Sequence, residues 1–374
     1  MDLYVHQHPT WPHFRWNAET VANQLASVRH HQGLFLGRIG GLGFELRTDT
    51  VLEALTDDVE KSSEIEGEHL NRQQIRSSIA RRLGMEIGNL VPADRHVEGV
   101  VDVILDATQR YDAPLTQERL FGWHAALFPT GYSGMWPIRV GAWRDDGKGA
   151  MQVVSGPIGK ERVHYEAPAA LRLEAEMTAF LEWFNVESAL DPVLKAALAH
   201  LWFVMIHPFD DGNGRIGRAT ADVALARSER SPQRFYSMSG QIMKECDAYY
   251  EVLGQVGVGD LDVTRWMTWF LGCLDRAIAG AEGVIGKVLT ETRFWDSISD
   301  VPINERQRLM LVKLHGNFEG KLTAKKWAVI CKCSPDTALR DITDLIYKGI
   351  LSLDQAGGRN TTYSLPPRSG MVER

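Results

Sequence analysis

The stretch from His207 to Arg218 holds, within twelve residues, the side-chain types that nucleotide chemistry needs. It reads His-Pro-Phe-Asp-Asp-Gly-Asn-Gly-Arg-Ile-Gly-Arg. A histidine titrates near neutral pH, so His207 could take a proton from a hydroxyl nucleophile. Asp211 offers the hard carboxylate oxygen that Mg²⁺ prefers. We interpret the stretch as a candidate site for a phosphate-containing ligand.

The Gly212-Asn213-Gly214 turn is predicted to bind an anion. Glycine permits positive φ and removes side chains, so successive backbone N–H groups can converge on one charge. We expect a helix to begin directly after the turn and to add the partial positive charge of its N-terminus. Arg215 and Arg218 would share one face of that helix, where guanidinium groups can grip phosphate oxygens. The apolar Phe209 is predicted to anchor the loop in the core.

The coarse properties of the chain indicate a soluble, cytoplasmic enzyme. Its 374 residues suffice for two or three domains, and its net charge of −7 argues against general binding to nucleic acid or to a membrane surface. No apolar run reaches the roughly 18 residues of a membrane span. The N-terminus lacks a signal pattern, and four cysteines are too few for a disulfide scaffold of this size.

Helical spacing of apolar residues predicts mostly helices up to residue 110 and on both sides of the motif. Expected domains are a helical region (1–110), a core (111–283), a linker helix (284–301), a third domain (302–366) and a tail (367–374). Within the core, a helix is expected over 167–185, and Met151–Ser155 and Arg162–Tyr165 are predicted to form a hairpin.

Residues 302–366 are predicted to form a winged helix. Thr323 and Ser334-Pro335 are helix-start signals, Gly349 is a stop signal, and 350–353 and 362–365 would form the wing hairpin. From residue 300 onward, twelve Lys and Arg stand against eight Asp and Glu. That mild basic excess permits contact with DNA. The alternative is that the module makes protein contacts or serves a structural role.

Each motif residue taken alone has an ordinary structural explanation, such as a packing histidine, a plain turn or solvated helix charges. The joint pattern of about eight fixed residues would occur by chance on the order of 10⁻¹⁰ times per position. It matches His-Pro-Phe-x-(Asp/Glu)-Gly-Asn-Gly-Arg-x-x-Arg without departure, and the chain therefore resembles the Fic family. The resemblance implies a mainly α fold: a Fic-fold helical core with a β-hairpin flap, a helical N-terminal region and, as in three-part bacterial members, a C-terminal winged-helix domain.

The resemblance also implies an activity, that of a protein adenylyltransferase using ATP and Mg²⁺. His207 would be the general base for a Ser, Thr or Tyr hydroxyl of a target protein, or of the chain itself in auto-adenylylation. Asp211 would hold Mg²⁺, and Gly212, Asn213 and Gly214 would form the anion hole. Arg215 and Arg218 would bind the β/γ end of ATP. Family members often form homodimers.

Two further parts of the site follow from the resemblance. Val153, Val154, Ser155 and Gly156 would belong to a flap that docks an extended target segment; the alternative is an ordinary surface hairpin. Tyr249 and Tyr250 would stack on or enclose adenine; the alternative is that this pair belongs to the core.

Residues 62–67, Ser-Ser-Glu-Ile-Glu-Gly, match the family's inhibitory pattern Ser/Thr-x-x-x-Glu-Gly/Asn. Glu66 would form a bidentate salt bridge with Arg218 and misalign ATP. Ser62 is expected to position the helix or Glu66, and Gly67 to give clearance. The alternative is that Glu66 is a solvated helix carboxylate.

Three other functions stay open at this stage. The chain could be a nucleotide-sensing regulator that binds DNA through its winged helix. It could remove AMP from a target, with Glu66 as a base for water. It could also phosphorylate its target, although relatives that do so replace the second glycine of the turn, and Gly214 is intact.

Overall fold

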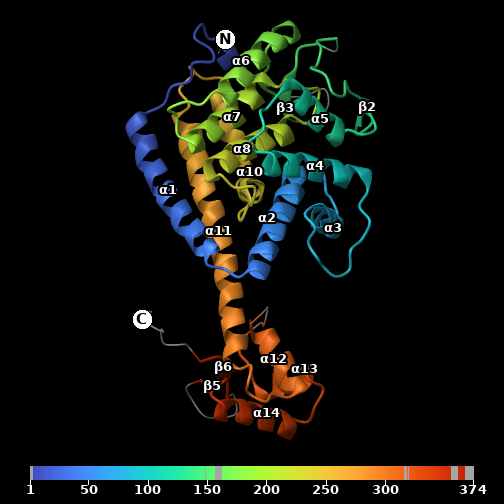
Figure 1. Ribbon diagram of the computed structural model, residues 1–374, viewed down its shortest axis with the longest axis vertical. Helices are drawn as coiled ribbons and strands as arrows, with labels where there is room; N and C mark the ends of the chain where they lie inside the picture. The colour runs from blue at the N-terminus through green and yellow to red at the C-terminus, as the bar shows by residue number, and fades with distance from the viewer. Residues whose placement is uncertain are drawn as a thin grey trace. The chain divides into compact units, whose positions relative to one another are not determined.

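The structure is a computed structural model that describes residues 3–147, 149–155, 162–315, 318, 320–354 and 361–366. It divides into two compact units, Met1–Val284 and Ile285–Arg374. Helices dominate the described residues, and each of the three small sheets there has two strands (Figure 1). None of the described helices combines the length and apolar character that crossing a membrane requires.

The first unit is built from helices that follow one another through short connections. They are α1 (Ala18–Gly40), α2 (Phe44–Ile65), α3 (Arg72–Arg82), α4 (Arg95–Gln109), α5 (Gln117–Leu127), α6 (Leu173–Asn185), α7 (Pro192–Ile206), α8 (Asn213–Glu229), α9 (Met238–Lys244), α10 (Cys246–Gly257) and the start of α11 (Thr264–Ser297), with the 3₁₀ turns η1 (Val5–Gln7) and η2 (Ala170–Arg172). A separate linker helix was expected from residue 284. The structure instead has one continuous helix from Thr264 across that position.

Helices α7 and α8 form the centre of the first unit and hold the motif between them. Asp191 caps α7 by accepting a hydrogen bond from the Val193 N–H at 2.8 Å, and Pro192 occupies its first turn. Nearly every α7 residue is buried, as expected for a helix that is apolar all round. A Cβ at Gly217 of α8 would lie 2.9 Å from Val204 of α7, so glycine permits the close approach. The loop between the helices therefore leaves the core at fixed points.

Helix α2 carries the predicted inhibitory residues to the first turns of α8. Along its length, the Asp58 carboxylate accepts hydrogen bonds from the Ser239 N–H at 2.9 Å and the Ser237 hydroxyl at 2.6 Å, at the start of α9. A buried ion pair between Arg234 and Asp222, at 3.0 Å, joins the loop before α9 to α8. These contacts fix the register of α2 against the motif helix.

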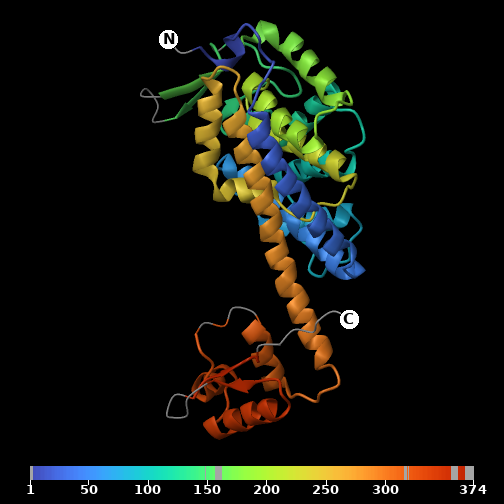
Figure 2. The same ribbon diagram turned by 90° about the vertical axis from the view of Figure 1, so that its left-hand side faces the viewer.

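The predicted hairpin is present as β3 (Gln152–Ser155) and β4 (Arg162–Glu166), antiparallel and with a register shift between Val153 and Val154. In Figure 2 it projects from the edge of the first unit. Buried Tyr165 anchors it by donating a hydrogen bond to the Met205 carbonyl at 2.7 Å. The turn, with Gly156, lies outside the described residues. A second, shorter hairpin pairs β1 (Tyr132–Ser133) with β2 (Trp136–Pro137).

The helix expected from residue 167 begins later, at Leu173, after η2. The Pro168 carbonyl accepts a hydrogen bond from the Arg144 guanidinium at 2.6 Å, in place of the main-chain hydrogen bond that it would accept within a helix. Pro168 also disfavours a helical conformation for the residue before it.

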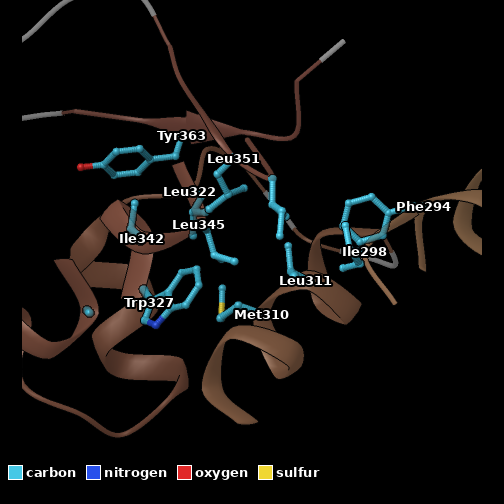
Figure 3. Close-up of a cluster of buried hydrophobic side chains, with 12 residues drawn as sticks. Phe294, Ile298, Met310, Leu311, Leu322, Trp327, Ile342, Leu345, Leu351 and Tyr363 are labelled. Atoms are coloured by element: carbon cyan, nitrogen blue, oxygen red, sulfur yellow. The ribbon is translucent and has the colours of Figure 1, made fainter. Parts of the chain in front are cut away.

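After the end of α11, the described residues of the second unit form three helices and then a hairpin, the order expected for a winged helix: α12 (Glu305–His315), α13 (Ala324–Ile330), α14 (Pro335–Tyr347), β5 (Ser352–Leu353) and β6 (Tyr363–Ser364). Thr323 and Ser334 cap α13 and α14 as predicted, and Gly349 has a φ of +69° after α14. Trp327, Met310 and Leu345 pack in one core (Figure 3). The winged-helix assignment stays a prediction, and the expected wing turn (357–360) and tail (367–374) fall outside the described residues.

Candidate active site

His207 lies at the C-terminal end of α7 in the left-handed conformation, with φ 52° and ψ 58°. Its Nδ1 is 3.2 Å from the Val204 carbonyl oxygen. A carbonyl only accepts hydrogen bonds, so Nδ1 carries the proton and Nε2 keeps a lone pair. Burial lowers the pKa of His207 below its ordinary value. The ring is therefore neutral at neutral pH and can act as a base.

The motif loop (His207–Arg218) is braced by contacts that its own residues make. Phe209 is fully buried, as predicted, with its ring stacked on His124 at 4.2 Å between centroids. The Asn213 side chain accepts a hydrogen bond from the Phe209 N–H at 2.9 Å and donates one to the Phe209 carbonyl at 2.8 Å. Within the anion hole expected of residues 212–214, Asn213 therefore offers only its main-chain N–H to a ligand.

The two glycines of the turn serve different purposes. Gly212 has a φ of +79° and is the residue before α8, where its freedom permits the sharp entry into the helix. Gly214 is already helical, and a Cβ there would lie 2.0 Å from Oε1 of Glu66. Of the two glycines, which both permit positive φ, only Gly212 adopts it. The Glu66 carboxylate thus lies against the first turn of α8, where a helix N-terminus favours an anion.

Arg218 is buried and is held by Ser62 in α2 and by Glu66, the residue at which α2 ends. Its Nη2 lies 2.9 Å from Oε1 of Glu66 and donates to the Ser62 carbonyl at 2.7 Å, while Nε donates to the Ser62 hydroxyl at 3.0 Å. Burial alone would lower the pKa of Arg218, but the Glu66 charge raises it. The expected bidentate salt bridge is not formed: Nε donates to Ser62, and Nη1 has no hydrogen-bond partner among the described residues. Ser62 grips the arginine itself rather than only positioning the helix.

Gly67 ends α2 by a change in backbone direction. Glu66 is the residue at which α2 terminates, so it is not on a solvated helix face, and Gly67 follows with a φ of +80°. The Glu68 N–H then bonds back to the Ser63 carbonyl at 3.0 Å. A Cβ at Gly67 would meet nothing within 4 Å. The expectation that Gly67 gives clearance is wrong; the left-handed conformation requires it.

Arg215 is held by a residue that sequence reasoning missed. Its Nη1 donates to Oε2 of Glu68 at 2.6 Å, and its guanidinium lies 5.0 Å from the centre of the Phe128 ring. Only 3% of the Arg215 side chain is exposed. Both arginines of the motif are therefore paired with residues of Ser62–Glu68, which we call the inhibitory segment after the role predicted for Glu66. A second glutamate two residues after Glu66 was the available signal.

Asp211 points its carboxylate toward neighbouring donors and a cavity. Oδ1 accepts from the Gly212 N–H at 2.5 Å, and Oδ2 accepts from the Ser133 hydroxyl. Among the described residues, no group of three or more His, Cys, Asp or Glu could enclose a metal. A lone carboxylate still fits Mg²⁺, which commonly takes its other ligands from substrate phosphates and water. Ser133 carried no sequence signal.

The two tyrosines of α10 differ in what they can offer a ligand. Tyr249 is buried and its hydroxyl lies 2.9 Å from Nε2 of His200. Its ring also packs on Trp269 at 5.4 Å. Tyr250 is 46% exposed, and its hydroxyl donates to the Ile65 carbonyl at 3.2 Å. The expected adenine-binding pair is thus reduced to Tyr250, because Tyr249 belongs to the core.

The flap residues and a missed arginine complete the surroundings of His207. Val154 is 46% exposed, and β3 pairs only with β4 among the described strands, so one strand edge is unpaired. Buried Arg144 donates from Nε to the His207 carbonyl at 2.8 Å and thereby fixes the histidine backbone. Arg144 lies in a loop without a recognisable pattern, so nothing in the sequence pointed to it.

Two family models match the chain. One, described as a domain of unknown function (DUF4172), matches residues 4–85, and the other, the Fic/DOC family, matches residues 114–225. A protein named protein adenylyltransferase Fic from Nematostella vectensis is 35% identical over 115 residues, 30% of this chain and 25% of that protein. Protein adenylyltransferase fic-1 from Caenorhabditis elegans is 41% identical over 59 residues, 15% of this chain and 12% of that protein. The chain spans a quarter or less of the length of these relatives.

Solved structures extend the likeness over more of the chain. A Fic family protein from Desulfovibrio desulfuricans G20 covers 95% of this chain and 98% of its own, with a TM-score of 0.54 and 20% identity. A Fic domain containing signaling protein from Bacteroides thetaiotaomicron covers 71% of this chain and 98% of its own, with a TM-score of 0.50 and 20% identity. These likenesses show a shared fold. The motif loop falls within residues 114–225, the part of the chain that matches the Fic/DOC family.

Proposed function

We propose that the chain is a protein adenylyltransferase that moves AMP from ATP to a Ser, Thr or Tyr hydroxyl of a target protein. The observation that carries the proposal is a neutral His207 with Nε2 available, held on one loop with a helix N-terminus that favours an anion. The names of the curated relatives support the same chemistry.

In the proposed reaction the acceptor oxygen attacks the α-phosphorus of ATP. Nε2 of His207 takes the hydroxyl proton, and the bond from the α-phosphorus to the oxygen that bridges to the β-phosphate breaks. Pyrophosphate leaves with the electron pair of that bond. The protein forms no covalent intermediate, so its contribution is positioning and charge neutralisation.

The remaining motif residues have roles that follow from their charge and place. The main-chain N–H groups at residues 212–214 would bind phosphate oxygens, and Arg215 and Arg218 would bind the β/γ end once they are released. Asp211 would hold Mg²⁺, which neutralises phosphate charge when bound. Tyr250 would contact adenine. The unpaired edge of the β3–β4 hairpin would dock an extended target segment by main-chain hydrogen bonds.

We further propose that the enzyme is autoinhibited by Glu66. Its carboxylate lies at the first turn of α8 and is paired with Arg218, so it competes with phosphate for both the helix N-terminus and the guanidinium. ATP bound beside it would be misaligned, and a misplacement of about 1 Å can cost roughly a hundredfold in rate.

The identity of the transferred group is tested with ATP labelled at either end. The Glu66→Gly chain is incubated with Mg²⁺ and with ATP labelled at the α- or at the γ-phosphate. We expect protein labelling from the α-label only, and its loss when His207→Ala is added. Labelling from the γ-phosphate would show phosphate transfer instead, and labelling that survives His207→Ala would contradict the general-base role. Glu64→Gly, the same exchange two residues earlier, is the control.

A further inference from the structure

A cavity of about 670 Å³ lies beside the motif loop, and Asp211 is the one residue of its lining to which the proposed AMP transfer assigns a chemical role. Its lining includes Asp210 and Asp211 of the loop, Trp136 of β2, and Gln152 at the start of β3. The lining is tied to the motif: the Arg139 N–H donates to Oδ2 of Asp210 at 2.8 Å, and the Ser133 hydroxyl donates to Asp211. The cavity therefore has a fixed position beside the candidate metal ligand.

Large apolar side chains are exposed at this cavity. Trp136 is 71% exposed, and its neighbour Met135 in the β1–β2 turn is 87% exposed. Exposed aromatic and methionine side chains are enriched in protein interfaces, and they are uncommon together on a surface without a partner. Because Trp136 lines the cavity and Met135 directly precedes it in the chain, the two indicate a surface for a protein segment.

The polar lining of the cavity is net negative. Apart from Asp211, which we assign to Mg²⁺, Asp145 and Asp210 contribute two carboxylates against one guanidinium, that of Arg139, whose Nη1 lies 3.2 Å from Asp145. A positive side chain would be attracted to this lining and a negative one repelled.

We propose that the cavity binds the residues beside the accepting hydroxyl of the target, and that it prefers an aromatic or large aliphatic side chain next to a Lys or Arg. This rests on the proposed function. A segment paired with the free edge of the hairpin would pass the cavity, because Met151 and Gln152 line it. Trp136 would contact the apolar side chain, and Asp145 and Asp210 would lie near the cation.

The test uses synthetic peptides that carry one central Ser, Thr or Tyr between randomised residues, with α-labelled ATP and the Glu66→Gly chain. We expect labelled peptides to be enriched in aromatic or large aliphatic residues and in Lys and Arg near the hydroxyl. Trp136→Ala should remove the apolar preference and raise the KM for peptide several-fold, with the KM for ATP unchanged. Asp145→Lys should remove the preference for Lys and Arg. Leu171→Ala is the control, since Leu171 is 89% exposed but does not line the cavity.

The outcomes separate this proposal from the proposed function. Peptides labelled without flanking preference, or a KM for ATP that rises with Trp136→Ala, would overturn the cavity proposal alone. Self-labelling without any peptide labelling would do the same. If the Glu66→Gly chain labels neither itself nor a peptide, adenylyl transfer is itself wrong.

An independent observation concerns the other arginine of the motif. Oε2 of Glu68 accepts from Nη1 of Arg215 at 2.6 Å and lies 3.1 Å from Nε2 of His96 in α4. Although burial alone would raise it, the hydrogen bond from His96 and the charge of Arg215 hold the pKa of Glu68 below its ordinary value. Glu68 is thus an anion held in place on a nearly buried cation.

We infer that Glu68 is a second inhibitory carboxylate, which withholds Arg215 from phosphate as Glu66 withholds Arg218. This also rests on the proposed function. Arg215 must exchange Glu68 for a phosphate before it can bind ATP, so the pair weakens ATP binding even after Glu66 is gone. His96 acts as a positioning residue because it holds the same carboxylate oxygen.

Binding rather than turnover tests this inference. ATP affinity is measured in the Glu66→Gly/His207→Ala chain, which needs no AMP transfer, with and without Glu68→Gln. We expect Glu68→Gln to tighten ATP binding by roughly two- to fivefold, the factor for loss of a partly exposed competing ion pair. Unchanged or weaker binding would overturn the inference, since Glu68 would then be neutral or would orient Arg215 for phosphate. Glu64→Gln is the control, because Glu64 pairs with Lys61 at 2.5 Å and not with the motif.

Discussion

The motif loop and the inhibitory segment are held in place by different kinds of interaction. The loop is fixed by the core itself: Phe209 is fully buried, and the Asn213 amide bonds both main-chain groups of Phe209. The inhibitory segment is held on α8 by polar contacts at the end of a helix, from Ser62 and Glu66 to Arg218 and from Glu68 to Arg215.

This difference suits the two proposed roles, because the geometry of the catalytic residues must stay constant whereas inhibition must be reversible. Close packing in the core gives one geometry for the base and the anion site. Ion pairs that are partly exposed can exchange a carboxylate for a phosphate without unfolding the core. The Glu66 side chain is 30% exposed while Arg218 is buried, so the carboxylate is the partner that can leave. Catalytic parts and inhibitory parts should therefore respond differently to mutation.

The largest expected effect is at the base. His207→Ala, placed in the Glu66→Gly chain, should lower the rate of AMP transfer by about 10² to 10⁴, the usual contribution of a general base. Fold stability should stay nearly constant because His207 makes one hydrogen bond to its own helix. Initial rates of AMP transfer by the two chains measure the effect on catalysis, and thermal unfolding of the two chains measures the effect on stability. A loss below tenfold would place the base elsewhere.

Removing one of the contacts that hold Arg218 should change the rate of AMP transfer by a smaller factor, and in the opposite direction. Ser62→Ala removes the hydroxyl that accepts from Nε but leaves the carbonyl that accepts from Nη2. Loss of one such bond weakens the inhibited state by about 1 to 2 kcal/mol, so AMP transfer should rise roughly five- to thirtyfold. Ser63→Ala is the matched control, since Ser63 is buried next to it and its hydroxyl has no hydrogen-bond partner among the described residues. A slower Ser62→Ala enzyme would mean that Ser62 supports catalysis.

The turn that ends α2 should be sensitive to backbone conformation and not to side-chain volume. Gly67→Ala places a Cβ in open space at a φ of +80°, so it should destabilise the fold by about 1 to 2 kcal/mol. Gly33→Ala in α1 also meets open space but is helical, and it should stabilise by about 0.5 to 1 kcal/mol. Chemical denaturation measures the free energy of unfolding of both variants. Equal changes in that free energy would contradict the role given to Gly67.

The smallest expected effect concerns the pH dependence of AMP transfer. His207 accepts a proton only when neutral, and burial holds its pKa below 6.5. Transfer by the Glu66→Gly chain should therefore be insensitive to pH above 6.5 and decline only below it. Glu66 raises the pKa of His207, so its removal moves this decline further toward acid. A rate profile with its midpoint above 6.5 would show a protonated base.

The sequence predicted the parts whose pattern is local. The caps at Thr323 and Ser334, the hairpin at 152–166 and the motif loop between two helices depend on residues close in the chain, and the structure has them. What it missed depends on packing between distant segments. Whether Tyr249 or Tyr250 is exposed depends on how α10 faces α11, and no periodic pattern distinguished them. The contact of Arg144 with the His207 carbonyl and that of Glu68 with Arg215 join segments far apart in the chain.

The most direct test of the account compares wild-type and Glu66→Gly chains in one measurement, the initial rate of protein labelling from α-labelled ATP with Mg²⁺. If Glu66 inhibits the site, we expect little labelling by the wild type and a rate higher by roughly a hundredfold in the variant, because the phosphates regain their alignment. Equal rates in the two chains would contradict it, because the Glu66 carboxylate on Arg218 would then not govern the site.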